Sequence, residues 1–184
     1  MECLKNVKDE LCNLCGLPIC SDQCQMGHNH YIECQVLSHV KNQGTLKMKQ
    51  KSVLPIRILA SCDLQETAYN KAKLFHVELS AESLDESVES FIKGSTTASI
   101  NDIQWAVQMA RRKTVETSNG QGSVFYPLFS LVSHACSPNA KFLVYPNHCM
   151  AMQAQRLIKS GEEICVSYVP TLEPTWKRRA MLYR

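Results

Sequence analysis

The chain has 184 residues, 20 basic and 17 acidic side chains, and a formal net charge of +3. This length supports one domain with at most a small appendage, and a hydrophobic fraction of 45% is enough for a buried core. The small charge does not argue for nucleic-acid binding, no apolar run reaches the roughly 18 residues of a membrane span, and the N-terminus lacks the apolar segment of a signal peptide. We therefore expect an intracellular protein.

The N-terminal segment is rich in cysteine, because six of the ten cysteines fall within the first 34 residues. Intracellular thiols stay reduced, so this pattern favours metal binding over disulfides. Cys12 and Cys15 form a C-x2-C pair, and His30 and Cys34 are four residues apart, which puts them on one face of a helix. Three thiolates and an imidazole are a typical ligand set of structural Zn²⁺. We predict a zinc site at these four residues, whose metal supplies folding energy to a segment too short to fold alone.

Two further cysteines, Cys20 and Cys24, lie between the halves of this ligand set and indicate a second, interleaved metal site. His28 is an alternative to His30 as a ligand, although the three-residue gap before Cys34 favours His30. The competing interpretation is that the thiols are buried or incidental.

The middle of the chain has apolar residues at three- and four-residue intervals, the pattern of amphipathic helices. The predicted helices cover residues 35–50, 53–59, 67–79, 82–92 and 99–112. Pro55 is expected in the first turn of the second helix, and Ser99 is expected to cap the last. Residues 115–126 then form an exit segment with a glycine-containing loop.

The C-terminal part contains two short polar runs separated by a hairpin. Residues 141–158 alternate in polarity on both sides of a turn at Pro146 and Asn147, which predicts a β-hairpin. Residues 133–139 contain Pro138 and small polar side chains, and they are expected to form a shaped loop. Residues 161–168 begin at a turn and continue as a β-branched strand that delivers Tyr168. A shaped loop beside a strand-end tyrosine indicates a small-molecule pocket.

These two runs carry a family resemblance. Ser133-His134-Ala135-Cys136-Ser137-Pro138-Asn139 resembles the N-H-S-C-x-P-N signature of the SET domain, and residues 161–168 resemble its G-E-E-(I/L/V)-x-x-x-Y signature. Residues 169–182 are similar to the segment that follows the tyrosine in the SET-and-MYND subfamily, and the cysteine spacing resembles the MYND zinc finger. The resemblance implies an α+β fold. It comprises a MYND-type finger at residues 1–34, a helical insert at 35–114 and a SET core of short strands at 115–184.

The resemblance also implies an activity: protein-lysine N-methylation with S-adenosylmethionine, on histone or other protein lysines. Tyr168 matches the catalytic tyrosine, and Ser133, His134 and Tyr168 match cofactor contacts. Because a MYND finger holds two zinc ions, Cys3 joins Cys20 and Cys24 in the second site. The competing interpretations are a tyrosine whose hydroxyl is satisfied locally and a histidine that only packs in its loop.

The sequence departs from the family pattern in ways that bear on activity. Ser133 replaces the usual asparagine, and residues 110–114 lack the asparagine that contacts the cofactor. The family's N-terminal glycine-rich loop and its C-terminal cysteine cluster have no counterpart, so the chain is expected to be truncated at both ends and weak as a methyltransferase. The alternative function is a catalytically inactive MYND/SET fragment acting as a zinc-dependent protein-interaction module. We expect a monomer in the nucleus or cytoplasm that meets protein substrates or peptides, with no membrane and no direct nucleic-acid contact.

Overall fold

The chain forms two compact units. The computed structural model describes residues 10–40, 43–64, 70, 86–117 and 122–183. The first unit comprises residues 1–115 and 125–127, and the second comprises residues 116–124 and 128–184. The first unit therefore holds both the cysteine-rich segment and the helices that follow it. None of the described helices is both long and apolar enough to cross a membrane.

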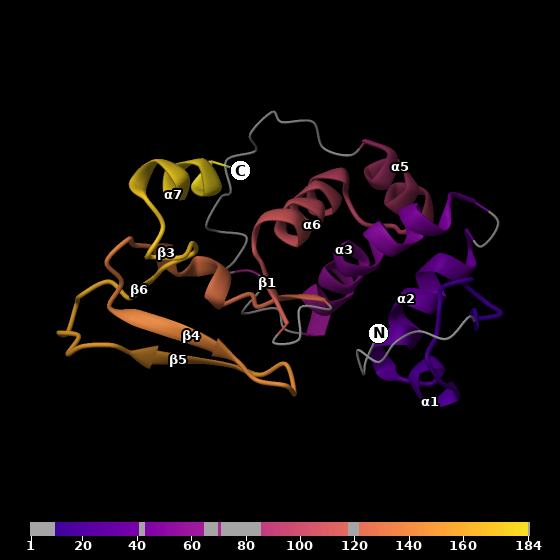
Figure 1. Ribbon diagram of the computed structural model, residues 1–184. Helices are drawn as coiled ribbons and strands as arrows, with labels where there is room; N and C mark the ends of the chain where they lie inside the picture. The colour runs from indigo at the N-terminus through magenta and orange to yellow at the C-terminus, as the bar shows by residue number, and fades with distance from the viewer. Residues whose placement is uncertain (1–9, 41–42, 65–69, 71–85, 118–121, 184) are drawn as a thin grey trace. The chain divides into compact units, whose positions relative to one another are not determined.

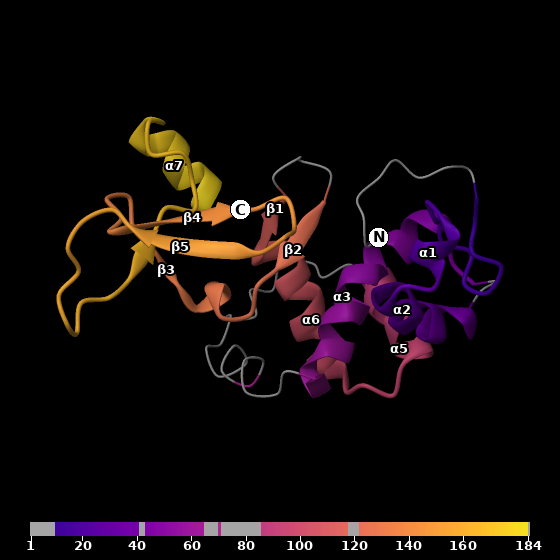
Figure 2. The same cartoon turned by 90° about the horizontal axis from the view of Figure 1, so that it is seen from below.

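Helices build the first unit (Figure 1). They are α1 Asp22–Gln25, α2 His28–Ser38, α3 Leu46–Leu64, α5 Glu86–Ser95 and α6 Ile100–Arg112. The long helix α3 contacts α2, α5 and α6, which gather around it in Figure 2. Leu37, Ile56, Ile92 and Ile103 are almost fully buried where these helices meet. Each such side chain contributes about 1.5–3 kcal/mol on burial, so the hydrophobic core of this unit runs along α3.

Helix α6 confirms the prediction for residues 99–112. The Ser99 hydroxyl accepts a hydrogen bond from the Asp102 N–H at 3.1 Å, so Ser99 is the N-cap. Ile103, Ala106 and Val107 form the buried face that the periodicity predicted. Helix α5 agrees with the predicted helix at 82–92 where that range is described. The predicted helix at 67–79 lies outside the described residues, apart from residue 70.

The predictions for residues 35–50 and 53–59 were wrong about where the helices begin and end. Helix α2 ends at Ser38, and the chain turns through Gly44, whose φ of +70° lies in the left-handed region that glycine adopts at little cost. Helix α3 then runs from the last residues of the first predicted segment through all of the second, so Pro55 lies inside it rather than in a first turn. Proline in a helix interior forfeits a backbone hydrogen bond. The burial of Ile56 and Ile58 beside it offsets that cost.

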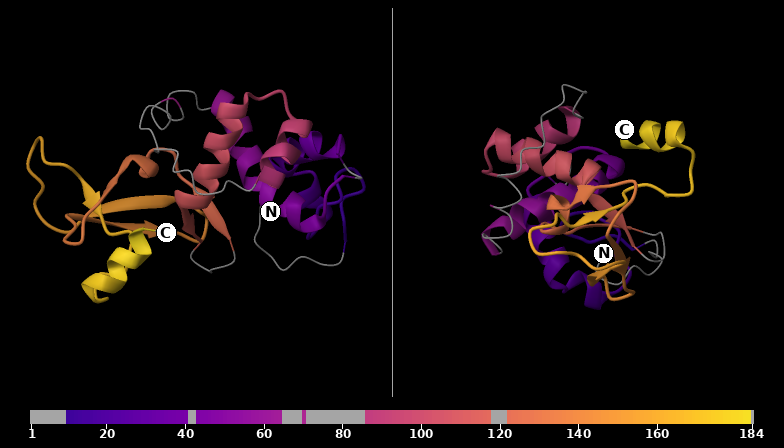
Figure 3. Two further views of the ribbon diagram at one scale, coloured as in Figure 1. Left: turned by 90° about the horizontal axis from the view of Figure 1, so that it is seen from above. Right: turned by 90° about the vertical axis from the view of Figure 1, so that its left-hand side faces the viewer.

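The described part of the second unit consists of short strands, a 3-10 turn and a helix. In chain order these elements are η1 Phe129–Leu131, β3 Ser133–His134, β4 Ala140–Val144, β5 Met150–Ala154, β6 Cys165–Val166 and α7 Thr175–Leu182. A further pair, β1 Thr114–Glu116 and β2 Ser123–Phe125, forms a separate two-stranded sheet. The helix coloured yellow in Figure 3 is α7.

Strands β4 and β5 form the predicted hairpin. They pair antiparallel from Ala140 opposite Ala154 to Val144 opposite Met150. The turn is closed by a hydrogen bond from the Tyr145 N–H to the Cys149 carbonyl, at 2.9 Å. The prediction for this segment is confirmed.

The polar run at residues 133–139 is only partly the loop that the sequence predicted. Ser133 and His134 form strand β3, which pairs parallel with β6 so that Ser133 lies opposite Cys165 and His134 opposite Val166. Small polar residues have a weak preference for strands, so the local sequence did not predict one here. Hydrogen bonds with the partner strand β6 hold these two residues in the extended conformation. This pairing brings the two signature runs side by side.

Candidate functional site

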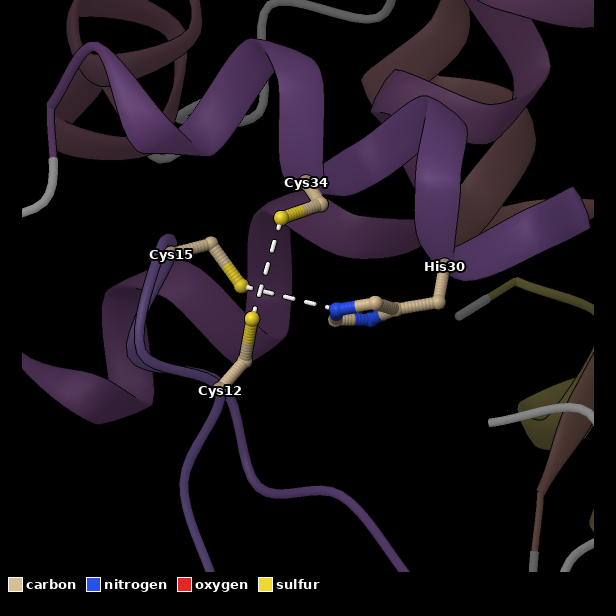
Figure 4. Close-up of side chains that lie close together, drawn as sticks. All are labelled: Cys12, Cys15, His30 and Cys34. Atoms are coloured by element: carbon tan, nitrogen blue, oxygen red, sulfur yellow. Dashed lines mark hydrogen bonds between the residues drawn. The ribbon is translucent and has the colours of Figure 1, made fainter. Parts of the chain in front are cut away.

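The first half of the cysteine-rich segment is a tight knuckle. The Gly16 N–H donates to the Cys12 carbonyl at 2.8 Å, and the Cys12 N–H donates to the Leu17 carbonyl at 2.8 Å. Gly16 has a φ of +74°, which a residue with a side chain adopts only with strain. The turn leaves both thiols, those of Cys12 and Cys15, on the side that faces helix α2 (Figure 4).

The structure brings Cys12, Cys15, His30 and Cys34 together (Figure 4). Their ligand atoms all lie within 4.8 Å of one another, and all four residues are buried. The sulfurs of Cys12 and Cys34 are 3.7 Å apart, and the Cys15 sulfur is 4.0 Å from His30 Nε2. A tetrahedron with Zn–S bonds of about 2.3 Å has S···S edges of about 3.8 Å. The cluster therefore has the donor set and the dimensions that fit a zinc ion.

Helix α2 delivers His30 and Cys34 from adjacent turns, and a carboxylate fixes the imidazole. His30 Nδ1 lies 3.1 Å from Glu33 Oε1, which leaves Nε2 toward the thiols. Arg57 Nε donates to Glu33 Oε2 at 2.7 Å. A carboxylate behind a ligating histidine orients the ring and raises its basicity. Sequence reasoning missed Glu33, although its place three residues after His30 on a helix was a usable signal; Arg57 had no such signal.

The three thiols of the cluster have different acidities. Burial raises the pKa of Cys12, but hydrogen bonds with the Cys15 N–H, the His30 side chain and the Leu14 N–H outweigh it and bring that pKa to about 6. Burial raises the pKa of Cys15. Burial and the negative charges of its neighbours raise the pKa of Cys34 to about 12. Three thiolates so close together need a cation among them, which a divalent metal supplies.

The cysteines of the expected second site stand apart from this cluster. Cys20 and Cys24 are both partly exposed, and the Cys24 N–H donates to the Ser21 hydroxyl that caps α1. Cys3 lies outside the described residues. The second metal site therefore stays a prediction.

In the second unit, Tyr168 and His134 lie in contact. The Tyr168 N–H donates to His134 Nδ1 at 3.0 Å, and the two rings are 5.5 Å apart. The Tyr168 hydroxyl donates to the Val132 carbonyl, just before strand β3. Burial and the neighbouring Cys165 raise the pKa of Tyr168, so its hydroxyl is protonated at neutral pH. If Tyr168 is only a packed residue, its hydroxyl needs a local partner of this kind. The same hydrogen bond also fixes the hydroxyl oxygen beside a backbone carbonyl.

The other predicted cofactor residues have partners within the same unit. The Ser133 hydroxyl donates to Glu163. Since His134 Nδ1 accepts from Tyr168, the neutral ring carries its proton on Nε2, which lies 3.3 Å from the Cys136 sulfur. The strand predicted to deliver Tyr168 is present only as β6, Cys165–Val166, so Tyr168 lies two residues beyond its end. The loop and Tyr168 are thus held in one hydrogen-bonded arrangement.

A buried asparagine ties the loop to the strand. Asn139 Oδ1 accepts from the Cys165 N–H at 2.9 Å, and Asn139 Nδ2 donates to the Glu163 carbonyl at 2.8 Å and to Glu162 Oε1 at 3.1 Å. Asn139 is 3% exposed, so every one of these bonds would be costly to lose. The sequence marked Asn139 as part of a motif but did not indicate this role.

The amino-acid sequence matches a known family. Residues 9–169 match the family model described as the SET domain. The chain belongs to the SET domain family. A SET and MYND domain-containing protein of Dictyostelium discoideum is 30% identical over 94 residues, 50% of this chain and 27% of that protein. SET domain-containing protein SmydA-8, isoform B, of Drosophila melanogaster is 21% identical over 184 residues, 91% of this chain and 40% of that protein. N-lysine methyltransferase SMYD2 of Homo sapiens is 36% identical over 61 residues, 33% of this chain and 14% of that protein.

The matches confirm the predicted SET-and-MYND-like family and the α+β fold class. The matched segments cover less than half the length of each of these three relatives. The SET match extends from residue 9, so it includes the Cys12–Cys15–His30–Cys34 cluster as well as the paired signature runs.

An open hollow of about 370 Å³ lies beside the SET signature loop. Its lining residues are Cys136, Ser137, Pro138, Ala140, Lys141, Phe142, Gln155, Ser167 and Thr171. Ser133, His134 and Tyr168 are not among them, although Cys136 and Ser167 are their neighbours in the chain. The hollow is therefore adjacent to the predicted cofactor contacts rather than formed by them.

The acidic pair of the second SET signature gives a pH prediction. Hydrogen bonds from Arg156, the Lys159 N–H and Asn139 lower the pKa of Glu162 to about 2 from an ordinary 4.5. A lowered folded-state pKa stabilises the fold fully above about pH 4.5, and this contribution is lost as pH falls toward 2. We expect Glu162→Gln to speed amide hydrogen exchange in β4 and β5 at pH 7, with the difference from wild type shrinking below about pH 4.5.

Both proteins would be measured with excess chelator, so that metal release does not add its own pH dependence. Glu173→Gln is the matched control, because the Glu173 carboxylate pairs with Lys177 of α7. If the difference in amide exchange between Glu162→Gln and wild type were the same at every pH, ionised Glu162 would not be the source of the stabilisation.

Proposed function

We propose that the chain carries the methyl-transfer centre of a protein-lysine N-methyltransferase that uses S-adenosylmethionine, together with a zinc-binding MYND-type finger. The single observation that carries the proposal is the placement of Tyr168 against His134 and Val132, which unites the two SET signatures in one site. The match to the SET family and the likeness to a human N-lysine methyltransferase support it. The substrate class is lysine in histones or other proteins, and the proposed setting is a monomer in the nucleus or cytoplasm.

The residues present fit what methyl transfer to an amine requires. S-adenosylmethionine supplies, when bound, an electrophilic methyl group on a sulfonium. The Val132 carbonyl and the Tyr168 hydroxyl put two oxygens side by side, which can make weak C–H···O contacts and orient an amine. The raised pKa of Tyr168 keeps this hydroxyl neutral. Ser133 and His134 would hold the donor, and since no acid–base step dominates, alignment is the main contribution of this site.

We propose that Cys12, Cys15, His30 and Cys34 hold one zinc ion. Its chemistry would be structural, because four protein ligands close the coordination shell and leave no open position for a substrate. The buried cluster and the fit of its sulfur–sulfur distance to a tetrahedron support this. Cys3, Cys20 and Cys24 are proposed for a second ion.

A second candidate function is a zinc-dependent protein-interaction module without catalysis. One observation favours it: the side chains of Ser133 and His134 are already engaged with Glu163, Cys136 and Tyr168. A cofactor that needs those polar groups must first displace these partners. The two candidates differ in whether the chain binds S-adenosylmethionine.

Titration of S-adenosylmethionine into the zinc-loaded chain, followed by calorimetry, tests the proposal. We expect binding in the micromolar range, with the affinity weakened about tenfold by His134→Gln, as for loss of one good hydrogen bond. His39→Gln is the matched control. It makes the same chemical change at an exposed histidine at the end of α2, in the first unit. If wild type gives no heat while zinc-dependent peptide binding is found, the interaction module replaces the enzyme.

A further inference from the structure

Helix α3 sends two basic side chains to the metal-binding segment. Lys49 Nζ donates to the carbonyl of the ligand residue Cys15 at 3.1 Å. Arg57, just over two turns further along α3, donates to Glu33, the carboxylate behind the ligand His30. One cation thus reaches the knuckle, and the other reaches the helix that carries the remaining two ligands.

The charge of a loaded cluster explains why cations are placed there. Three thiolates and a neutral imidazole around a divalent ion leave one net negative charge, and Glu33 adds a second. Glu33 is 3% exposed, and the four ligand residues are buried as well. A buried net charge is costly unless opposite charges offset it. The ammonium of Lys49 and the guanidinium of Arg57 supply two positive charges that match these two negative ones.

The burial of Lys49 is the stronger sign of such a role. Lysine is almost never fully buried unless it is paired, and Lys49 is 5% exposed with its ammonium bonded to the Cys15 carbonyl. Its ammonium lies against the knuckle so closely that a Cβ added at Gly16 would stand 3.5 Å from Nζ. Lys47, two residues earlier on the same helix, is exposed. Of these two lysines of α3, only Lys49 is buried against the cysteine segment.

We propose that Lys49 and Arg57 are positioning residues of the metal centre, so that zinc loading and the packing of helix α3 stabilise each other. The proposal rests on the zinc site proposed above. Its consequence is that the finger does not act as an independent module: loss of the metal would loosen α3, which contacts α5 and α6 in the same unit.

Zinc affinity of the full chain, measured by competition with a chromophoric chelator, tests this. We expect Lys49→Met and Arg57→Gln each to weaken zinc binding by about 10- to 100-fold, the usual effect of losing a partner behind the ligands. Lys47→Met removes the same charge from an exposed site on the same helix and is expected to leave the affinity unchanged. Arg57→Lys keeps the charge and is expected to recover part of the loss.

Hydrogen exchange gives a second measurement, independent of affinity. Zinc is expected to slow amide exchange along α3 in wild type and in Lys47→Met, and to do so less in Lys49→Met. Substitution by Co²⁺ would verify, from its thiolate absorption bands, that each variant still uses the same ligands. The Co²⁺ spectrum thus distinguishes a variant that has misfolded from one that is folded but binds zinc more weakly.

Three results would count against the inference in distinguishable ways. Variants that bind zinc as tightly as wild type, but melt at a lower temperature equally with zinc and with chelator, would show that the cations serve only the fold. Weakening by Lys47→Met equal to that by Lys49→Met would show a general effect of charge. A wild-type chain that binds no zinc would overturn the proposed metal site itself.

Discussion

Cys34→Ser is expected to abolish zinc binding at the Cys12–Cys15–His30–Cys34 cluster and to unfold the metal-binding segment. Structural zinc contributes about 10–16 kcal/mol in small finger peptides, whereas a whole domain is stable by only about 5–15 kcal/mol. Cys34 lies in α2 with its sulfur 3.7 Å from that of Cys12, so its loss removes one corner of the tetrahedron. Zinc per chain, from elemental analysis, and the helical signal on heating are the measurements.

The matched control for this substitution is Cys149→Ser. Cys149 is an exposed thiol in the turn of the β4–β5 hairpin, within the second unit, so the same atom changes without touching the cluster. We expect the control to keep the zinc content and the melting temperature of wild type. Cys34→Ser with an unchanged zinc content would show that the ion is held elsewhere.

The Cys12–Cys15–His30–Cys34 cluster was predictable because its sequence signals are local. A C-x2-C pair and a histidine four residues before a cysteine each fix two ligands within one turn of chain, whatever the rest of the fold does. The structure brings together the four residues that this spacing named. Only the approach of the Cys12–Cys15 pair to the His30–Cys34 pair depends on tertiary structure. That approach could be expected, because the four side chains together form a typical ligand set for zinc.

The partners behind the ligands were not predictable in the same way. Lys49 and Arg57 belong to a helix that the sequence divided in two, because Pro55 was expected to begin a new one. Packing of Ile56 and Ile58 keeps that helix continuous, and only a continuous helix places both cations against the cysteine segment. Propensity is a weak guide where tertiary burial outweighs it.

The second unit depends still more on distant residues. Strands β3 and β6 are two residues long and pair parallel, with Ser133 opposite Cys165. A pair that short leaves no periodicity in the sequence, and its stability comes from Asn139, which bonds the strand across the loop. The signature runs could be recognised by resemblance, but the contacts between them could not be derived from the residue pattern.

Tyr168→Phe is expected to reduce methyl transfer to protein lysine about 100-fold or more while leaving S-adenosylmethionine binding nearly unchanged. The substitution keeps the ring that packs against His134 and removes only the hydroxyl beside the Val132 carbonyl. Loss of one preorganised hydrogen-bonding group at a reaction centre typically costs about 10²–10³ in kcat. Transfer of label from tritiated S-adenosylmethionine to core histones measures kcat, and calorimetry measures cofactor affinity.

Tyr145→Phe separates catalysis from stability. Tyr145 is 47% exposed and Tyr168 is 42% exposed, so the two substitutions remove a hydroxyl from tyrosines of similar overall exposure in the same unit. A structural role alone for the Tyr168 hydroxyl would lower stability by about 1 kcal/mol, the usual net value of a hydrogen bond, and leave kcat unchanged. A catalytic role lowers kcat in Tyr168→Phe and not in Tyr145→Phe, at temperatures where both variants are fully folded. The ratio of the two rates therefore decides between the two roles of Tyr168.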